Sequence, residues 1–299
     1  MDYVATLIAH PDAALPDGIE RLAVECLPGA AKPSWLDPDH ALDIPFDGSG
    51  EVCAAATALA ALRLALGDAA VDVVVQDTAG RRKRLLLADM DSTMIGQECI
   101  DELADFIGQK ARVAAITERA MRGEIEFAPA LRERVAVLAG LPAAVVDEVI
   151  AKRITLTPGG PVLVRTMRGH GAYTCLVSGG FTVFTGKIAA LIGFDENRGN
   201  RLIIRDDGRF AGAVAEPILG RDAKLETLKE LRRKLSLARN DTLVVGDGAN
   251  DLAMICDAGL GIAFHAKPVV AQSAAARIDY SDLTALLFAQ GYRREEFVE

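Results

Sequence analysis

LLLADMDST, residues 85–93, is the stretch of sequence that decides the fold. Its first four residues form a short, continuous apolar run, which is typical of a strand buried on both faces of a parallel sheet. Asp89 and Asp91 follow this run two residues apart, so both carboxylates leave the predicted sheet at the same edge. The pattern D-x-D-x-T indicates either functional carboxylates or a plain turn, because Asp and Ser also favour turns.

Similar apolar runs recur after residue 85 and alternate with helical patterns. The expected strands lie within AYTCLVSGG (172–180), DTLVVGDG (241–248) and GLGIAF (259–264). Between them, patterns such as LETLKELRRKL (225–235) place leucines on one face of a helix. The alternation predicts an α/β fold, a doubly wound, Rossmann-like parallel sheet. LIIRDDGRFAGAV (202–214), with its Asp-Gly turn, predicts a β-hairpin.

Residues 97–155 interrupt this alternation, because they contain only helical patterns. Four such patterns occur there: ECIDELADFI, ARVAAITERAM, FAPALRERVAVLA and AAVVDEVIAKR. An all-helical insert after the first strand of the sheet is expected to form a cap over the carboxyl ends of the strands. Ligands bind at that edge in open α/β sheets, so the cap is expected to close a site.

Residues 1–80 predict a separate, small α+β domain, and residues 81–299 the α/β domain with its cap. The expected elements of the first domain are a strand (VATLIA), a helix (IERLAVECL), a Pro/Gly/Asp-rich loop over residues 28–50, a helix (VCAAATALAALRLAL) and a strand (VDVVVQD). The boundary is placed near Gly80, where TAGRRKR (78–84) is a turn signal. Its four cations are expected in a solvated linker and strand edge.

Composition narrows the class of protein. The 299 residues include 33 Lys and Arg against 42 Asp and Glu, a net charge of −9, which argues against nucleic acid as a partner. Charged residues interrupt the most apolar window, Val52 to Val75, so no membrane-spanning segment is expected. The five cysteines form no C-x-x-C pair, and the N-terminus lacks the cationic region of a signal peptide. These features favour a cytoplasmic protein with reduced thiols.

A second acidic loop follows another predicted strand. Gly246-Asp247-Gly248-Ala249-Asn250-Asp251 comes directly after the apolar run Leu243–Val245. Hard divalent cations prefer carboxylate oxygens as ligands. Two acidic loops at one sheet edge therefore predict a Mg²⁺ site, whereas a plain Gly/Asp turn would account for only one of them.

Two further signals concern anion binding. Ser178-Gly179-Gly180 follows the strand at Cys175–Val177 and opens a helix, where a hydroxyl and free backbone N–H groups can bind an anion. A simple N-cap is the alternative, because Ser is common there. Lys224 lies beside the start of another predicted helix, where a cation opposes the helix dipole. This position suggests another task for its ammonium, although most isolated lysines are solvated.

The order strand-DxDxT, strand-S, Lys and strand-GDxxxD resembles the haloacid dehalogenase superfamily of phosphohydrolases over residues 85–280. Longer motifs are similar to those of the phosphoserine phosphatases within it: DMDSTMIGQE, MRGEIEFAPALRERV, VSGGF, GFD…NRL and VGDGANDLAMICDAGLGIAFHAKP. Residues 1–80 resemble the ACT-like N-terminal module of many bacterial members. The resemblance implies Mg²⁺-dependent hydrolysis of O-phospho-L-serine to L-serine and phosphate, the last step of serine biosynthesis.

The resemblance also implies roles for individual residues. Asp89 is the expected nucleophile, which forms an aspartyl-phosphate, and Asp91 the general acid and later the base. The expected Mg²⁺ ligands are Asp89, the backbone carbonyl of Asp91, and Asp247. The expected phosphate-binding and supporting groups are Ser178, Gly179, Gly180, Lys224, Asn250 and Thr93, with Asp251 orienting the metal shell or Lys224.

Substrate choice is expected to lie in the cap. The resemblance assigns Glu98 to the substrate ammonium and Arg134 to its carboxylate, and Met121 and Phe127 to positions that cover the substrate. Spacing alone does not separate Glu98 from its acidic neighbours, which are Asp101, Glu102 and Asp105. Helical periodicity places Phe127, Leu131, Val135 and Leu138 in one apolar sector, with Arg134 at its edge. There Arg134 either extends its charge into solvent or meets a buried anion. On periodicity alone, Met121 and Phe127 would be ordinary core.

Two other functions stay open at this point. One is a related phosphatase or phosphotransferase that acts on another small phosphomonoester. The other is an amino-acid-sensing regulatory protein built on residues 1–80, although a sensor has no need of both Asp89 and Asp91. The expected partner is small-molecule phosphoserine, with a homodimer left open.

Overall fold

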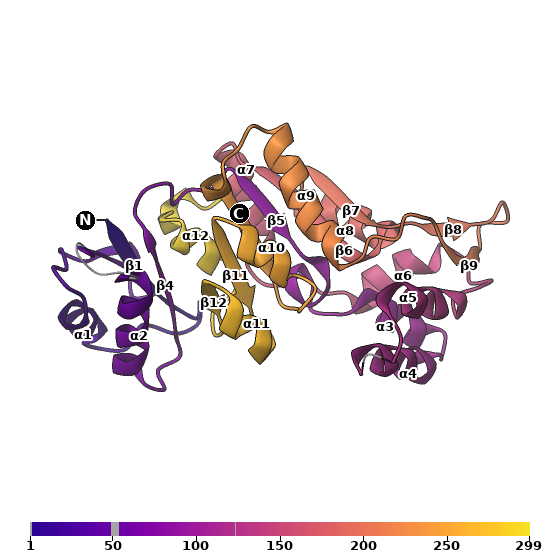
Figure 1. Ribbon diagram of the computed structural model, residues 1–299, viewed down its shortest axis with the longest axis horizontal. Coiled ribbons are helices and arrows are strands. Elements are labelled where there is room, and N and C mark those ends of the chain that lie inside the picture. Colours follow the sequence, from indigo (N-terminus) through magenta and orange to yellow (C-terminus); the bar gives the residue numbers. More distant parts are fainter. Residues whose placement is uncertain (1, 49–53, 123) are drawn as a thin grey trace.

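The computed structural model describes residues 2–48, 54–122 and 124–299, without the side chains of Met121, Arg221 and Val269. A six-stranded sheet forms the centre of the molecule. Its strands lie in the order β12 (Ala276–Ile278), β11 (Leu260–Phe264), β10 (Thr242–Gly246), β5 (Leu85–Ala88), β6 (Tyr173–Phe181) and β7 (Glu196–Asn200). All neighbouring strands run parallel. A small N-terminal module lies at one end of this sheet and a helical cap at the other (Figure 1).

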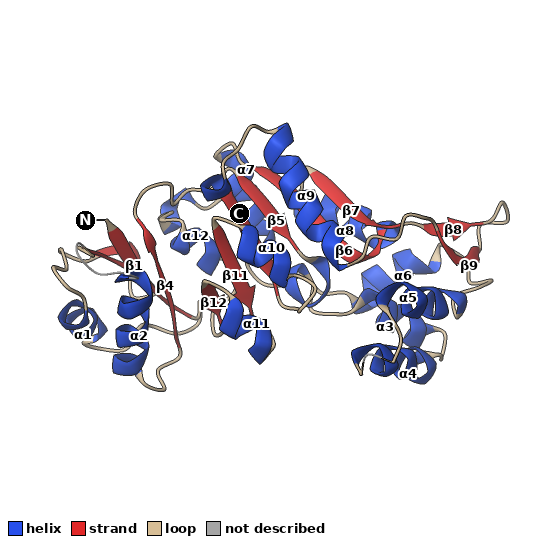
Figure 2. Cartoon of the chain, viewed as in Figure 1, coloured by secondary structure: helices blue, strands red, loops and turns tan. Residues whose placement is uncertain are grey.

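Helices cover both faces of the sheet (Figure 2). One face carries α7 (Gly160–Gly169), α8 (Thr182–Ile192) and α12 (Ala285–Ala289), and the other α9 (Arg221–Lys234), α10 (Leu252–Asp257) and α11 (Pro268–Ser273). Alternate side chains of β5 serve the two faces: Leu86 packs in the first cluster, and Leu85 and Leu87 in the second. The prediction of a doubly wound sheet buried on both faces is therefore confirmed.

Four helices form the cap, as predicted: α3 (Cys99–Phe106), α4 (Lys110–Met121), α5 (Phe127–Ala136) and α6 (Val145–Arg153). The predicted hairpin, β8 (Leu202–Ile204) and β9 (Phe210–Val214), joins them. The Gly140 N–H donates to the carbonyl of Phe210 at 2.8 Å, and the Phe210 N–H donates to Leu141 at 2.9 Å. A Cβ on Gly212 would lie 2.7 Å from the Cβ of Ala139. The backbone of the hairpin therefore packs directly against the cap, with no room for a side chain at position 212.

The N-terminal module has the order β1 (Tyr3–Ala9), α1 (Ile19–Cys26), β2 (Ser34–Asp37), β3 (Ala41–Phe46), α2 (Ala54–Leu66) and β4 (Val71–Asp77). Its antiparallel strands lie in the order β2-β3-β1-β4, a βαββαβ arrangement. The prediction of a loop over residues 28–50 is wrong, because this segment contains β2 and β3. β3 is buried along nearly its whole length and contains Pro45, so it shows no polar–apolar alternation. The first two residues of the second predicted helix lie outside the described residues.

The prediction of a solvated linker at residues 78–84 is wrong for two of its four cations. Arg81 forms a half-buried ion pair with Asp43 of β3, at 2.6 Å, and also donates to the carbonyl of Phe288 at 3.3 Å. Lys83 is buried, and its ammonium donates to the carbonyls of Gly80 and Asn240 at 2.8 and 2.9 Å. Burial lowers the pKa of Lys83. The linker therefore fastens the module to the core.

Membrane insertion finds no support in the helices. Within residues 2–48, 54–122 and 124–299, no helix combines the length and the apolar character that a bilayer crossing requires.

Candidate active site

The strand order reverses between β5 and β10, the two central strands. The chain leaves β5 toward β6 and β7 on one side, and later continues from β10 toward β11 and β12 on the other. Asp89 follows β5 and Asp247 follows β10, so the two loops lie side by side. The Asp89 N–H donates to the carbonyl of Val245 at 3.0 Å, which fixes their register. Ligands bind at such a reversal point in open α/β sheets.

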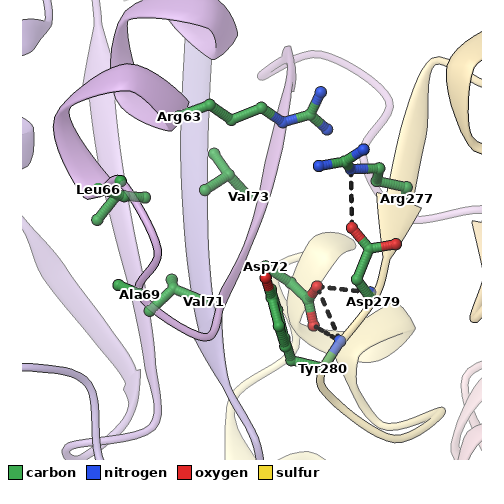
Figure 3. A pocket seen from close by; sticks show the side chains of 10 residues that line it. Arg63, Leu66, Ala69, Val71, Asp72, Val73, Arg277, Asp279 and Tyr280 are labelled. Atoms are coloured by element: carbon green, nitrogen blue, oxygen red, sulfur yellow. Dashed lines mark hydrogen bonds and ion pairs between the residues drawn. The ribbon is translucent and has the colours of Figure 1, made fainter.

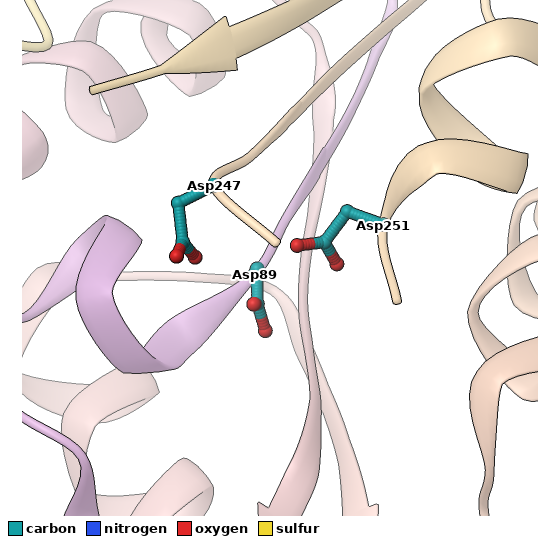
Figure 4. Close-up of side chains that lie close together, drawn as sticks. All are labelled: Asp89, Asp247 and Asp251. Atoms are coloured by element: carbon teal, nitrogen blue, oxygen red, sulfur yellow. The ribbon is translucent and has the colours of Figure 1, made fainter. Parts of the chain in front are cut away.

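Three carboxylates converge there. One oxygen from each of Asp89, Asp247 and Asp251 lies within 4.8 Å of the other two (Figure 4). Glycine is required at position 246, because a Cβ there would lie 2.5 Å from the Asp251 carboxyl carbon. The Asp251 carboxylate also accepts the Gly248 N–H at 3.1 Å, which holds the second acidic loop closed. The structure thus places the two predicted acidic loops at one point.

Lys224 is the cation of this cluster. Its side chain is buried, and its ammonium lies 2.6 Å from Asp89 and 2.6 Å from Asp251. The lysine belongs to the first turn of α9, where its charge opposes the helix dipole. Burial alone would lower the pKa of Lys224, but the two carboxylates outweigh burial and raise it. Lys224 is therefore held as an ammonium.

The carboxylates outnumber this single ammonium. Burial, and then the negative charge of Asp251, raise the pKa of Asp89 well above its ordinary value, although Lys224 opposes the shift. The same two causes raise the pKa of Asp247, whose oxygen accepts the buried Thr93 hydroxyl at 3.1 Å. Three oxygen donors with excess negative charge in a buried place fit a hard divalent cation. Asp251, rather than the Asp91 side chain, is the third member of the cluster.

Asp91 faces a different set of partners. It lies in the turn Met90–Met94 with an extended backbone, and Ser92 after it adopts a φ of 57°. Its carboxylate accepts the Cys99 N–H at 2.9 Å and the Ser178 hydroxyl at 3.0 Å. The turn therefore sends the Asp89 side chain to the acidic cluster and the Asp91 side chain to the loop after β6.

Ser178, Gly179 and Gly180 form that loop. Ser178 is buried, and its hydroxyl oxygen accepts the Gly180 N–H at 2.8 Å. A Cβ on Gly180 would lie 3.0 Å from the Ser178 hydroxyl and 3.1 Å from the Asp91 carboxylate. A side chain at position 180 would therefore press on both groups. The helix that follows this loop starts at Thr182, because β6 extends to Phe181.

Asn200, at the end of β7, is a residue for which the sequence predicted no role. Its buried amide donates to the carbonyls of Gly179 and Leu219 at 2.8 and 3.1 Å, and accepts the Leu219 N–H at 2.8 Å. One side chain thus ties the serine loop to the segment that leads into Lys224. The only sequence signal was the NRL motif. Because β7 is a polar edge strand, its composition does not indicate that Asn200 is buried.

Two oppositely charged side chains lie on the cap side of the site. Glu98 accepts the Ser92 hydroxyl at 2.9 Å. Glu98 is an exposed residue, but desolvation of its carboxylate, and then the charge of Asp91, raise its pKa to about 7. Arg134 is half-buried on α5, and within the described parts of the chain its only hydrogen bond is a 3.4 Å contact to the carbonyl of Ala130. Burial lowers the pKa of Arg134, while Asp101 and Glu98 oppose this.

The remaining predicted residues lie around this opening. Phe127 is 41% exposed rather than part of the apolar sector of α5, so its interpretation as ordinary core is wrong. A Cβ on Gly179 or on Gly220 would lie 3.6 Å from its ring, which places Phe127 against the core loops. Asn250 is exposed in the second acidic loop. The side chain of Met121 lies outside the described residues.

Comparison with known families agrees with the arrangement of the strands and the acidic loops. The family model of the haloacid dehalogenase-like hydrolases matches residues 86–255, a span that begins at β5 and includes both acidic loops. The chain is a haloacid dehalogenase-like hydrolase.

Three known proteins show how far the similarity of this hydrolase extends. Phosphoserine phosphatase SerB2 of Mycobacterium tuberculosis is 43% identical over 228 residues, covering 76% of the hydrolase and 55% of that protein. The phosphoserine phosphatase of Saccharomyces cerevisiae is 33% identical and covers 98% of the hydrolase and 97% of itself. The structure of a probable phosphoserine phosphatase from Vibrio cholerae matches with a TM-score of 0.77 at 27% identity, covering 99% and 88% of the two chains.

The hydrolase is shorter than several of these relatives. It spans 55%, 58% and 63% of the phosphoserine phosphatases from M. tuberculosis, Streptomyces coelicolor and Archaeoglobus fulgidus. Family membership assigns the fold and the hydrolase class.

Proposed function

We propose that the hydrolase removes phosphate from O-phospho-L-serine, with Mg²⁺ as its cofactor. The observation that supports this substrate is the presence of two oppositely charged side chains, Arg134 and Glu98, on the cap side of the acidic cluster, without an ion pair between them. Arg134 is half-buried without a carboxylate within ion-pair distance among the described residues. Phosphoserine carries a carboxylate and an ammonium beyond its phosphate, and these match the two side chains.

Asp89 acts as the nucleophile. One of its carboxylate oxygens attacks phosphorus, a P–O bond to Asp89 forms, and the bond between phosphorus and the serine oxygen breaks. Asp89, Asp247 and the backbone carbonyl of Asp91 would hold the Mg²⁺, which when bound would supply positive charge that lets two anions approach. Lys224 contacts Asp89 directly, at 2.6 Å, and its ammonium holds a phosphoryl oxygen while Asp251 keeps it in place.

Asp91 moves the protons. It gives a proton to the departing serine oxygen, and in the second half-reaction it takes one from the water that attacks the aspartyl-phosphate. Its contact with Ser178 suits this role, because the Ser178 hydroxyl also reaches the phosphoryl oxygens from the same loop. Water attack breaks the P–O bond to Asp89, and the products are L-serine and inorganic phosphate.

The test is phosphate release from phosphoserine, measured with and without Mg²⁺ on the wild type and on Asp89→Asn. We expect Mg²⁺-dependent release by the wild type and none by the variant, because an amide cannot attack phosphorus. The variant should still bind phosphoserine in a calorimetric titration. Faster hydrolysis of a phosphomonoester without ammonium and carboxylate would overturn the substrate, and near-normal turnover by Asp89→Asn would overturn the nucleophile.

A further inference from the structure

A cavity that none of the acidic-cluster residues lines lies where the N-terminal module meets the core (Figure 3). Its walls come from the end of α2 and the start of β4 on one side, and from β12 and the residues after it on the other. Its volume is about 190 Å³. Pockets that bury drug-sized ligands start at roughly 300 Å³, so this one fits a small ligand only.

The base of the cavity is rigid. Asp72 of β4 is buried, and its two carboxylate oxygens accept the backbone N–H groups of Asp279 at 2.7 Å and Ser281 at 2.8 Å. Tyr280 adds a longer contact, at 3.3 Å. The Asp72 carboxylate is therefore held in place by the peptide groups of the core, and together with Asp279 its charge partly offsets that of Arg63.

Two arginines, one from each part of the chain, face this cavity. Arg63 comes from α2 and Arg277 from β12, and their guanidinium groups point toward each other (Figure 3). Arg277 uses its Nε for an ion pair with Asp279 at 2.8 Å. Its two terminal nitrogens form no hydrogen bond or ion pair with any described residue. Arg63 has no hydrogen bond or ion pair to any described residue. Burial, and then the charge of Arg277, lower the pKa of Arg63, while Asp279 and Asp72 oppose this shift without reversing it.

We propose that this cavity binds a small oxyanion, a phosphate or a carboxylate group, between Arg63 and Arg277. A guanidinium presents a planar fork of N–H donors that matches two oxygens of such a group. An anion between the two forks removes their mutual repulsion and gives partners to donors that otherwise lack them. Because one fork belongs to the module and the other to the core, the bound anion also bridges the two parts.

The experiment is calorimetric titration of the full chain in a divalent-cation-free buffer, with inorganic phosphate in one arm and L-serine in the other. The variants are Arg63→Gln and Arg277→Gln, and the matched control is Arg21→Gln, an exposed arginine of α1. We expect each interface variant to weaken binding about tenfold or more, and the control to bind like the wild type. Binding of phosphate alone assigns the site to phosphate, and binding of serine alone assigns it to a carboxylate.

A second readout separates this site from the active site and from misfolding. Without the anion, Arg63→Gln should melt at the same temperature as the wild type or higher, because it removes an unpaired cation. With the anion, only the wild type and the Arg21→Gln control should gain in Tm. The KM for phosphoserine should be the same in Arg63→Gln and the wild type. The proposal is overturned if neither anion binds the wild type, or if both interface variants bind as it does.

Discussion

The ammonium of Lys224 lies 2.6 Å from the carboxylate of Asp89, and both side chains are almost completely shielded from solvent. The two residues are distant in sequence, since 134 residues lie between Asp89, directly after β5, and Lys224 in the first turn of α9. A buried ion pair of this kind is costly to break from one side, because the remaining charge stays in a place of low polarity.

Replacement of Lys224 by Met should therefore destabilise the fold as well as abolish turnover. We expect a loss of about 3–5 kcal/mol in the free energy of unfolding, measured by urea denaturation in EDTA. Mg²⁺ should restore part of this loss, since a divalent cation compensates the carboxylates left behind. Lys229→Met, on the solvent side of the same helix, is the control and should change stability by no more than about 0.5 kcal/mol. Equal stability of the two variants would contradict the role of Lys224 as the internal counter-charge.

Arg134→Ala should damage hydrolysis of phosphoserine much more than hydrolysis of an aryl phosphate that lacks a carboxylate. A charge-assisted hydrogen bond contributes roughly 1.5–3 kcal/mol, or about one to two decades in kcat/KM. Arg134→Lys should recover only part of the loss, because a point charge replaces a bidentate fork. Arg132→Ala removes an exposed arginine of the same helix, paired with Glu216, and should affect both substrates little. Equal losses on the two substrates would assign Arg134 to cap folding instead.

The pKa of Glu98, about 7, predicts a pH dependence of substrate binding. Below this pH Glu98 takes up a proton and loses the charge that attracts the substrate ammonium. The KM for phosphoserine should therefore rise as pH falls through 7, by up to about tenfold per pH unit. An aryl phosphate without an ammonium is the control, since its phosphate titrates in the same way. In Glu98→Gln the ratio of the two KM values should be independent of pH, and a persisting slope would point to another acid.

Asn200 supplies a prediction about positioning. Asn200→Ala removes three hydrogen bonds and leaves backbone groups of Gly179 and Leu219 without partners, which costs about 1–3 kcal/mol. Because both loops lead to the proposed phosphate-binding groups, kcat should fall while the KM and the pH profile change little. Asn200→Asp, which keeps the shape but cannot donate, should be nearly as damaging. Asn197→Ala, on the same strand, is the control, and a matching loss there would reduce Asn200 to a structural residue.

The central fold was predictable because its information is local. Four apolar runs gave β5, β6, β10 and β11, and four amphipathic patterns gave the cap helices. The edge strand β7 reads ENRGN, and its extended shape comes from pairing with β6 rather than from its own residues. β2 and β3 were missed for the same reason. Arg81 and Lys83 were predicted to be solvated because they lie in a charged turn segment. Their burial depends on contacts with distant segments, which a local pattern does not reveal.

The candidate site was predictable in part. Asp89, Asp247 and Asp251 converge because each lies in a loop that follows a central strand. In open α/β sheets the loops after the two central strands meet at the same edge. The exposure of Phe127 was not predictable, because a helical wheel assigns faces but does not show what each face meets at the end of a helix. The clamp at Asn200 depends on two loops 40 residues apart, Gly179 and Leu219, so no local pattern reveals it. The roles assigned to the individual residues stay predictions that the variants above address.

The anchoring of Arg81 has a mechanical consequence. A connection that is pinned at Asp43 and at the carbonyl of Phe288 cannot serve as a hinge, since any rotation there would strip a half-buried guanidinium of its acceptors. A rotation of the N-terminal module against the sheet would therefore have to break contacts on both sides of this connection.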